Sequence, residues 1–262
     1  MTVLIGFLLS LAGFVLVGVL SVRRAMPTSD DYLLAGRKVS PWLTALSAIA
    51  TNNSGFMFIG LIGVTYSEGL TALWMMAGWM AGDYAVWLLV ARRLRSRSAE
   101  LAVASIPGFL SAPEAGDSIR LRRLLVIVTA LIVVVFLGAY AAAQLNAGSK
   151  ALHVLFGWDY RAGALLGAVL VVIYCFSGGI RASIWTDAAQ SFIMIGAMVL
   201  LLGAALLELG GLVELFRQLR EIDPSLLSIT PGSAKFGVLA FLCSWFFAGL
   251  GVAGQPHIMI RA

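Results

Sequence analysis

Four hydroxyl or amide residues and a glycine interrupt an apolar stretch of the chain, in the sequence Ala50-Thr51-Asn52-Asn53-Ser54-Gly55. The residues from Trp42 to Val64 are otherwise mostly apolar and numerous enough to cross a bilayer as a helix. An unpaired backbone amide in hydrocarbon costs several kcal/mol, so a helix breaks at membrane depth only where protein, water or an ion takes over the freed groups. The interruption therefore suggests a binding site. The alternative is that Ser and Asn only bond across to neighbouring helices.

A second apolar stretch is interrupted in the same way, from Gly249 to His257. Glycine imposes no Cβ restraint on the backbone, and Pro256 removes a donor and disfavours helix at Gln255. Two interrupted spans at corresponding positions of two halves are typical of a transporter, in which unwound carbonyls coordinate a cation. Trp245 and Phe246 could supply an apolar wall beside this second break.

The composition places the chain in a membrane. Hydrophobic residues make up 60% of its 262 positions and charged residues 12%, and the mean hydropathy is +0.95. Soluble domains carry about 25% charged residues. Seven spans are predicted. A short amphipathic helix from Leu212 to Arg220, between the sixth and seventh spans in the sequence, is expected to lie at the membrane–water interface. The spans are Val3 to Val22, Trp42 to Val64, Leu70 to Val90, Leu124 to Ala143, Gly163 to Phe176, Ile184 to Leu206 and Phe236 to Ala253.

The distribution of basic residues predicts the topology. Of the 18 Lys and Arg residues, 13 lie in the tail and in the loops after spans one, three and five. The positive-inside rule then puts the N-terminus outside and Arg261 in the cytoplasm. This distribution accounts for the net charge of +5 without a nucleic-acid partner. It also makes spans two and seven cross the membrane in opposite directions, as an inverted repeat requires.

Five motifs together resemble the sodium:solute symporter family, and the resemblance runs over nearly the whole chain. They are Ser29 to Arg37, Ala50 to Gly55, Phe176 to Ile180, Trp185 to Gln190 and Gly254 to Ile258. The resemblance implies an all-α membrane protein with a LeuT-like core of two inverted five-helix repeats preceded by one extra helix. Residues 1–40 would be the extra helix and loop, 41–206 the first repeat, and 207–262 the interfacial helix and first helix of the second repeat. We therefore expect a truncated, N-terminal portion of a transporter, with the remaining repeat missing from this chain.

The resemblance also implies a sodium site. In the family, backbone carbonyls at the first break hold the coupling Na⁺, and the matching carbonyls here are those of Ala50 and Asn53. Asn52 and Ser54 can brace the turn, although Asn52 stands where proline symporters have an aspartate. Asp187 matches an acidic residue linked to cation coupling. Its alternative role is to interact with the first turn of span six, where Asp is favoured.

The family places the solute in the unwound part of the seventh span. The positions matching the proline symporter's aromatic contacts are Ala248 and Val252, neither of which is aromatic, whereas Pro256 is retained. A solute other than proline is therefore expected, with Trp245 as a further apolar contact. Three residues of the signature motif and the tail are expected to act in gating or positioning, namely Gln255, His257 and Arg261.

Asp83 departs from the family pattern, since it is an acid within span three. A charge at the bilayer centre costs at least about 2.5 kcal/mol. It therefore faces a wet cavity, or is protonated and hydrogen-bonded, or reaches the inner interface near Arg92. The last interpretation is favoured.

The expected function is sodium-coupled symport of a small organic solute, amino-acid-like or related, by alternating access in the cell's inner membrane. The alternatives are a transporter-like sensory module and an inactive fragment. An enzymatic role is not expected, because the sequence shows no nucleophile with a base partner, no phosphate loop and no metal cluster.

Overall fold

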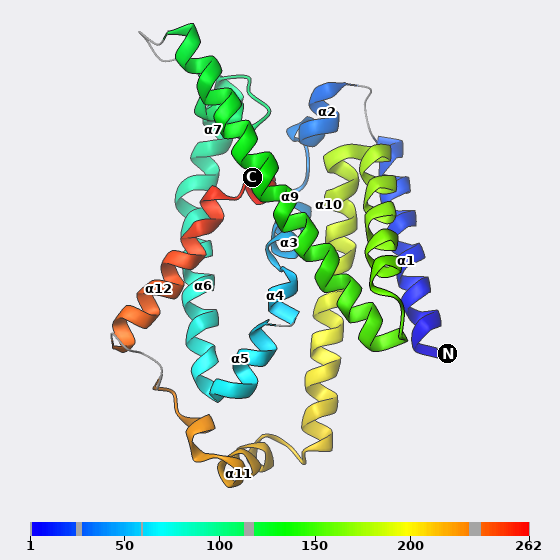
Figure 1. Cartoon of the computed structure of the whole chain (residues 1–262), viewed down its shortest axis with the longest axis vertical. Helices are drawn as coiled ribbons and strands as arrows, with labels where there is room; N and C mark the ends of the chain where they lie inside the picture. Colours follow the sequence, from blue (N-terminus) through cyan, green and yellow to red (C-terminus); the bar gives the residue numbers. More distant parts are fainter. Residues whose placement is uncertain (1, 25–27, 59, 113–117, 231–236, 262) are drawn as a thin grey trace. The chain divides into compact units, whose positions relative to one another are not determined.

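The structure is a computed structural model that describes residues 2–24, 28–58, 60–112, 118–230 and 237–261, and every regular element in these ranges is helical. The longer helices of Figure 1 are α1 (Thr2–Ser21), α3 (Pro41–Asn52), α5 (Gly60–Glu68), α6 (Ala72–Val86), α7 (Arg92–Glu100), α9 (Ile119–Phe156), α10 (Tyr160–Glu208), α11 (Leu212–Ile222) and α12 (Val238–Leu250). The shorter elements are η1 (Val22–Arg24), α2 (Ser29–Leu34), η2 (Ala35–Arg37), α4 (Gly55–Phe58), η3 (Gly69–Thr71), η4 (Trp87–Ala91), α8 (Ile106–Leu110), η5 (Pro224–Leu227), η6 (Gly251–Gly254) and α13 (Pro256–Met259).

Helices long and apolar enough to cross a membrane are present, as the composition predicts. Among the described residues, four segments meet both criteria, Thr2–Ser21, Gly55–Glu100, Ile119–Phe156 and Gly178–Glu208, and two shorter apolar helices are Tyr160–Ile173 and Val238–Gly254. Large apolar side chains along α9 point outward, and Leu131, Val134 and Val135 are 59%, 69% and 63% exposed. Such a surface suits lipid rather than water. The chain is a multi-pass membrane protein.

Three predicted spans differ from the observed helices. The fifth and sixth spans are joined in the single element α10, which contains a kink at Gly179. The fourth lies within α9, whose 38 residues extend beyond the apolar run at both ends. The predicted amphipathic segment after the sixth span does form a helix, α11, in which Arg217 pairs with Glu214 and Glu221.

The chain forms two compact units. The first contains Met1–Thr51, Leu94–Ser191 and Pro256–Ala262, and the second contains Asn52–Arg93 and Phe192–Gln255. The helix breaks at Asn53 and at Gln255 thus lie close to the points where the chain passes from one unit to the other.

In the first unit, the kink of α10 is held against α1 and α2. Gly179 has φ 57° and ψ −145°, a conformation that only glycine adopts readily, and a Cβ there would overlap the carbonyl of Tyr32. Beside it, the buried carboxylate of Asp31 forms an ion pair with Arg181. Arg181 also donates to the carbonyl of Ala35 at 2.9 Å. Two of the motifs noted in the sequence are therefore in direct contact.

Another arginine of the first unit caps α7. The guanidinium of Arg37 donates to the carbonyls of Arg95, Ser98 and Val103 at 3.2 to 3.4 Å, and to the Ser98 hydroxyl at 3.2 Å. The Ser98 and Val103 carbonyls lie at or just after the C-terminus of α7, where a cation is favoured. The loop after α1 is thereby fixed to the end of α7.

In the second unit, α6 and α12 pack backbone against backbone. A Cβ on Gly82 would overlap the carbonyl of Phe246, and a Cβ on Gly249 would overlap the carbonyl of Trp79. Gly78 and Gly82 form a Gly-x-x-x-Gly pair, which allows membrane helices to approach closely. The Trp79 and Trp245 rings stack beside this contact with centroids 6.3 Å apart.

Candidate functional site

The first predicted break is present in the structure. Helix α3 ends at Asn52, Asn53 and Ser54 are not helical, and α4 begins at Gly55. The Ser54 hydroxyl accepts a hydrogen bond from the Phe56 amide at 3.2 Å, so it satisfies one of the free donors at the start of α4. Ala50 lies in the last turn of α3, where carbonyls have no partner further along the helix. Carbonyl and hydroxyl oxygens of this kind suit a hard cation.

The second predicted break is also present. Helix α12 ends at Leu250, the 3₁₀ turn η6 follows, and Gln255 is extended with φ −103° and ψ 98° before α13 begins at Pro256. The predicted solute contacts differ in their surroundings: Ala248 is exposed, Val252 is fully buried, and Trp245 packs on Trp79.

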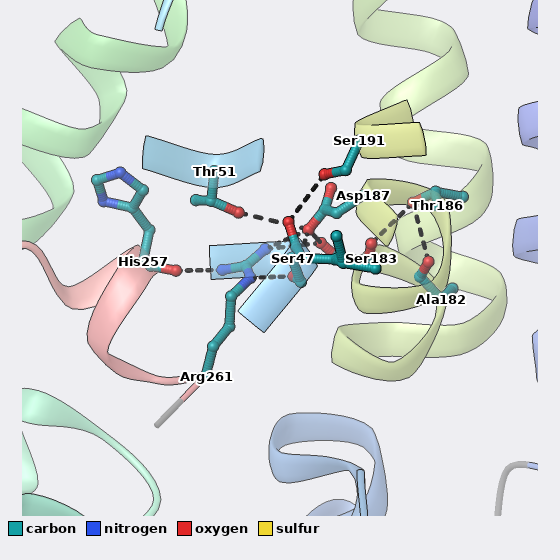
Figure 2. A network of polar contacts seen from close by, with 10 residues as sticks. Ser47, Thr51, Ala182, Ser183, Thr186, Asp187, Ser191, His257 and Arg261 are labelled. Atoms are coloured by element: carbon teal, nitrogen blue, oxygen red, sulfur yellow. Dashed lines mark hydrogen bonds and ion pairs between the residues drawn. The ribbon is translucent and has the colours of Figure 1, made fainter. Parts of the chain in front are cut away.

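A polar network within the first unit gathers around Asp187 (Figure 2). The Ser47 hydroxyl donates to Asp187 Oδ2 at 2.8 Å, and the hydroxyls of Thr51 and Ser183 lie 3.4 Å from the same oxygen. Ser191, one turn along α10, donates to the carbonyl of Leu46 at 2.9 Å. These contacts join α3 to α10.

Arg261 completes this network from the other end of the chain. Its Nη2 donates to Asp187 Oδ2 and to the Ser183 hydroxyl, both at 2.9 Å, and its Nε donates to the Ser47 hydroxyl at 2.7 Å. Arg261 also donates to the carbonyl of His257, one turn back in the sequence. The Arg261 and Asp187 side chains are 7% and 16% exposed, so the ion pair is largely buried.

Arg261 also lines a hollow of the first unit. The hollow encloses about 720 Å³ of space, part of it open to solvent, and Arg37 and Arg95 contribute to its wall. These three arginines come from the two loops and the tail that the positive-inside rule assigns to the cytoplasm. The Arg261 end of the network therefore lies next to a space that water can enter from this basic side.

His257 takes no part in the network through its ring. The ring lies 5.1 Å from that of Tyr140, and within the described part of the chain its two buried nitrogens have no hydrogen-bond partner. Only its backbone carbonyl contacts Arg261.

Asp83 lies in the second unit and faces the first break. Its Oδ2 accepts a hydrogen bond from Asn52 Nδ2 at 3.0 Å. The favoured interpretation, in which this side chain reaches the inner interface near Arg92, is therefore wrong. The nearby amide of Asn52 offers the carboxylate a direct partner within the bundle.

Several network residues were not identified from the sequence, although their spacing carries a signal. Ser47 and Thr51 are four residues apart on α3, and Ser183, Asp187 and Ser191 repeat at the same interval on α10. Residues four apart lie on one face of a helix. Two such polar faces in apolar spans predict that each face contacts a polar partner. They do not predict which helices meet.

Comparison with known proteins extends these observations. The model of the sodium:solute symporter family matches residues 32–262. The chain is 34% identical over 247 residues to the high-affinity proline transporter PutP of Bacillus subtilis, covering 94% of this chain and 50% of that protein. It is 37% identical over 234 residues to the osmoregulated proline transporter OpuE of B. subtilis, covering 88% and 46%.

A solved structure shares the fold. It is a Na⁺-coupled sialic acid symporter in a substrate-bound outward-open state, with a TM-score of 0.77 and 25% sequence identity, and the match covers 96% of this chain and 51% of that one. The chain spans about half the length of the curated relatives it matches. With its broken helices, its shared fold and a family match over most of its length, the chain belongs to the sodium:solute symporter family.

Proposed function

We propose that this protein takes part in Na⁺-coupled symport of a small organic solute by alternating access. The observation that carries the proposal is the break of the second apolar span, where α3 ends at Asn52 and α4 begins at Gly55. The matching break at Gly251–Gly254 and Gln255 supports it. A transporter exposes a site at such breaks to each side of the membrane in turn.

For the ion, we propose that the carbonyl oxygens of Ala50 and Asn53 are ligands of Na⁺. Asn52 and Ser54 support the turn that presents them, and the hydrogen bond from Phe56 to Ser54 fits this role. Asp187 acts on coupling through the network around it. Its pairing with Arg261 makes the carboxylate responsive to the position of α13.

For the solute, the names of the relatives favour proline as the first candidate. This differs from the expectation drawn from Ala248 and Val252, which lack aromatic rings. We propose a proline-sized amino acid that contacts Ala248, Val252, Pro256 and Trp245 near the second break. The burial of Val252 requires η6 to move before that residue can touch a solute.

For gating, we propose that Arg261 closes the cytoplasmic side by bonding to Asp187, Ser47 and Ser183. Gln255 and His257 position the turn that carries it. In this arrangement the protein lies in the cell's inner membrane with its N-terminus outside and its C-terminus in the cytoplasm. Residues 41–206 form the first repeat, and a second repeat acts as the partner of this chain.

Uptake measurements test the proposal. Proteoliposomes containing the protein are given radiolabelled proline, other amino acids, sugars and carboxylates, with and without an inward Na⁺ gradient. Proline uptake that depends on Na⁺ is the expected result, and Asp187→Asn should weaken the Na⁺ dependence. Uptake driven by a proton gradient and indifferent to Na⁺ would reject sodium as the coupling ion. No uptake of any solute would favour a sensory module or an inactive fragment.

A further inference from the structure

Asp83 differs from two aspartates of the first unit in the kind of partner that it has. There, the buried Asp31 pairs with Arg181, and the largely buried Asp187 pairs with Arg261. In the second unit, Asp83 forms no ion pair with a described residue; the side chain that bonds to it is the neutral amide of Asn52, at 3.0 Å. An amide satisfies a hydrogen bond but leaves the negative charge in place.

Asp83 Oδ1 is buried, and among the described residues it accepts no hydrogen bond of ordinary geometry. The Trp87 side chain, one helical turn further on, is the next possible donor to the carboxylate. A buried carboxylate oxygen without a donor is costly unless a cation or a proton occupies the space beside it.

The described elements that contact α6 carry no positively charged side chain. The elements with contacts to α6 include α5, η3, η4, α12 and η6, and together they contain one charged residue, Glu68 at the end of α5. Glu68 is an acid, so it cannot neutralise Asp83. The nearest arginines in the sequence, Arg92 and Arg93, are exposed. Among the described elements that pack on α6, no side chain therefore supplies the compensating positive charge.

The position of the carboxylate indicates which cation. Asn52 is the last residue of α3, so its side chain links Asp83 directly to the helix break. The residues of the break offer amide, hydroxyl and backbone oxygens, which together with one carboxylate form a ligand set for a hard monovalent cation. A soft metal would require Cys or His, and the described residues hold no group of three His, Cys, Asp or Glu placed for a metal ion.

We propose that Asp83 is a cation ligand that supplies the negative charge at the first helix break, with Oδ1 taking Na⁺ and Asn52 orienting the carboxylate through Oδ2. The proposal rests on the proposed function in one respect, the identity of the ion. It assigns to α6 a ligand that no motif of the sequence analysis contains.

Chemical modification tests the proposal without measuring transport. Dicyclohexylcarbodiimide adds to protonated carboxyl groups in apolar surroundings, and mass spectrometry of the purified protein locates each adduct. At pH 6 in choline chloride, Asp83 should be modified. Sodium at about ten times its dissociation constant should slow this modification roughly tenfold, because the ion-occupied carboxylate is neither protonated nor accessible. Potassium at the same concentration should protect less.

Two internal controls keep the result specific. Asp187, paired with Arg261, should resist the reagent in both salts, and Asp83→Asn should remove the adduct from its peptide. Asn52→Leu should leave modification in place but weaken protection by Na⁺, since the carboxylate loses its orienting bond. A substitution of Glu68 to Gln should leave sodium protection unchanged.

Two results would overturn the proposal: modification of Asp83 at equal rates in sodium and choline, or no modification of Asp83 in either salt. Neither depends on uptake. Na⁺-driven uptake together with an Asp83 insensitive to sodium would reject this site and keep the proposed function. Sodium protection without uptake would keep the site and reject the transport activity.

Discussion

Arg261 donates a hydrogen bond to Asp187 at 2.9 Å, although the two residues lie 74 positions apart in the chain. The same guanidinium reaches Ser47 on α3 and Ser183 on α10. One side chain near the end of α13 thus holds three helical segments of the first unit together. The serines share the hydrogen-bonding capacity of the guanidinium, so the buried cation is well satisfied.

Breaking this buried ion pair from one side should be costly. Asp187→Asn or Arg261→Met leaves the other charge buried without its partner, and the expected loss is about 3–5 kcal/mol of unfolding free energy for either single change. The double variant should lose much less than the sum of the two, because neither charge remains. Denaturant unfolding of the purified protein in detergent measures these differences.

The matched control is the exposed pair of Arg97 and Glu100, whose side chains are 64% and 62% exposed. Arg97→Met should cost less than about 1 kcal/mol. Equal losses at Arg97 and Arg261 would show that the buried network does not stabilise the first unit.

The packing of α6 on α12 predicts that substitutions of two different glycines have very different effects on stability. Gly82→Val places side-chain atoms against the backbone of α12 near Phe246 and should destabilise the protein by about 1–3 kcal/mol or more. Gly13→Val in α1 meets no atom within 4 Å and should be close to neutral. Thermal unfolding followed by tryptophan fluorescence compares them. Equal melting temperatures for the two variants would contradict the close approach.

Capping of α7 by Arg37 predicts a local change in hydrogen exchange. Arg37→Lys keeps the charge but loses the planar fork that reaches the carbonyls of Arg95, Ser98 and Val103. Amides at the C-terminal end of α7 and in the following turn should exchange several-fold faster. Hydrogen exchange with mass spectrometry measures this, with peptides of α11 as an unaffected reference. Unchanged exchange around Ser98 would show that the cap does not hold the helix end.

The α11 helix predicts an acid-dependent contribution to stability. Hydrogen bonds from Arg217 lower the pKa of Glu214 from 4.5 to about 2. Because the pKa of Glu214 is lowered in the folded state, its interaction with Arg217 stabilises the helix at pH values above the ordinary pKa of 4.5. This contribution is lost as the pH falls through the lowered pKa of about 2. NMR titration of ¹³C-labelled glutamate should show a carboxyl with this low pKa. Arg217→Gln should return it towards 4.5, and a Glu214 pKa that does not respond to this change would exclude Arg217 as the cause.

Helices and their breaks were largely predictable, while their contacts were not. The apolar runs and the polar or glycine-rich interruptions at Asn53 and at Gln255 depend on local chemistry, and both breaks are confirmed. A boundary between Phe176 and Ile184 was predicted, but not its form, a kink at Gly179 within α10, because the close contact of Gly179 with Tyr32 depends on tertiary structure. For the same reason the sequence indicated that Asp187 and Arg261 matter but not that they bond.

Asp83 shows the same limit. Its position in an apolar run indicated an unusual residue, but proximity in the sequence favoured the interface near Arg92. The partner is Asn52, 31 residues earlier. Helix packing decides which polar group a side chain contacts. The periodicity of a single sequence does not reveal this choice.

Gly82 of α6 and Gly249 of α12 bring the two helices together backbone to backbone, with no side chain between them at these two positions. We therefore expect the two helices to move as one rigid pair, because a displacement here would press backbone atoms against each other. The turn at Gly251–Gly254 follows directly on α12, and Asp83 lies next to Gly82 on α6. Movement of that turn is then expected to shift the Asp83 carboxylate as well.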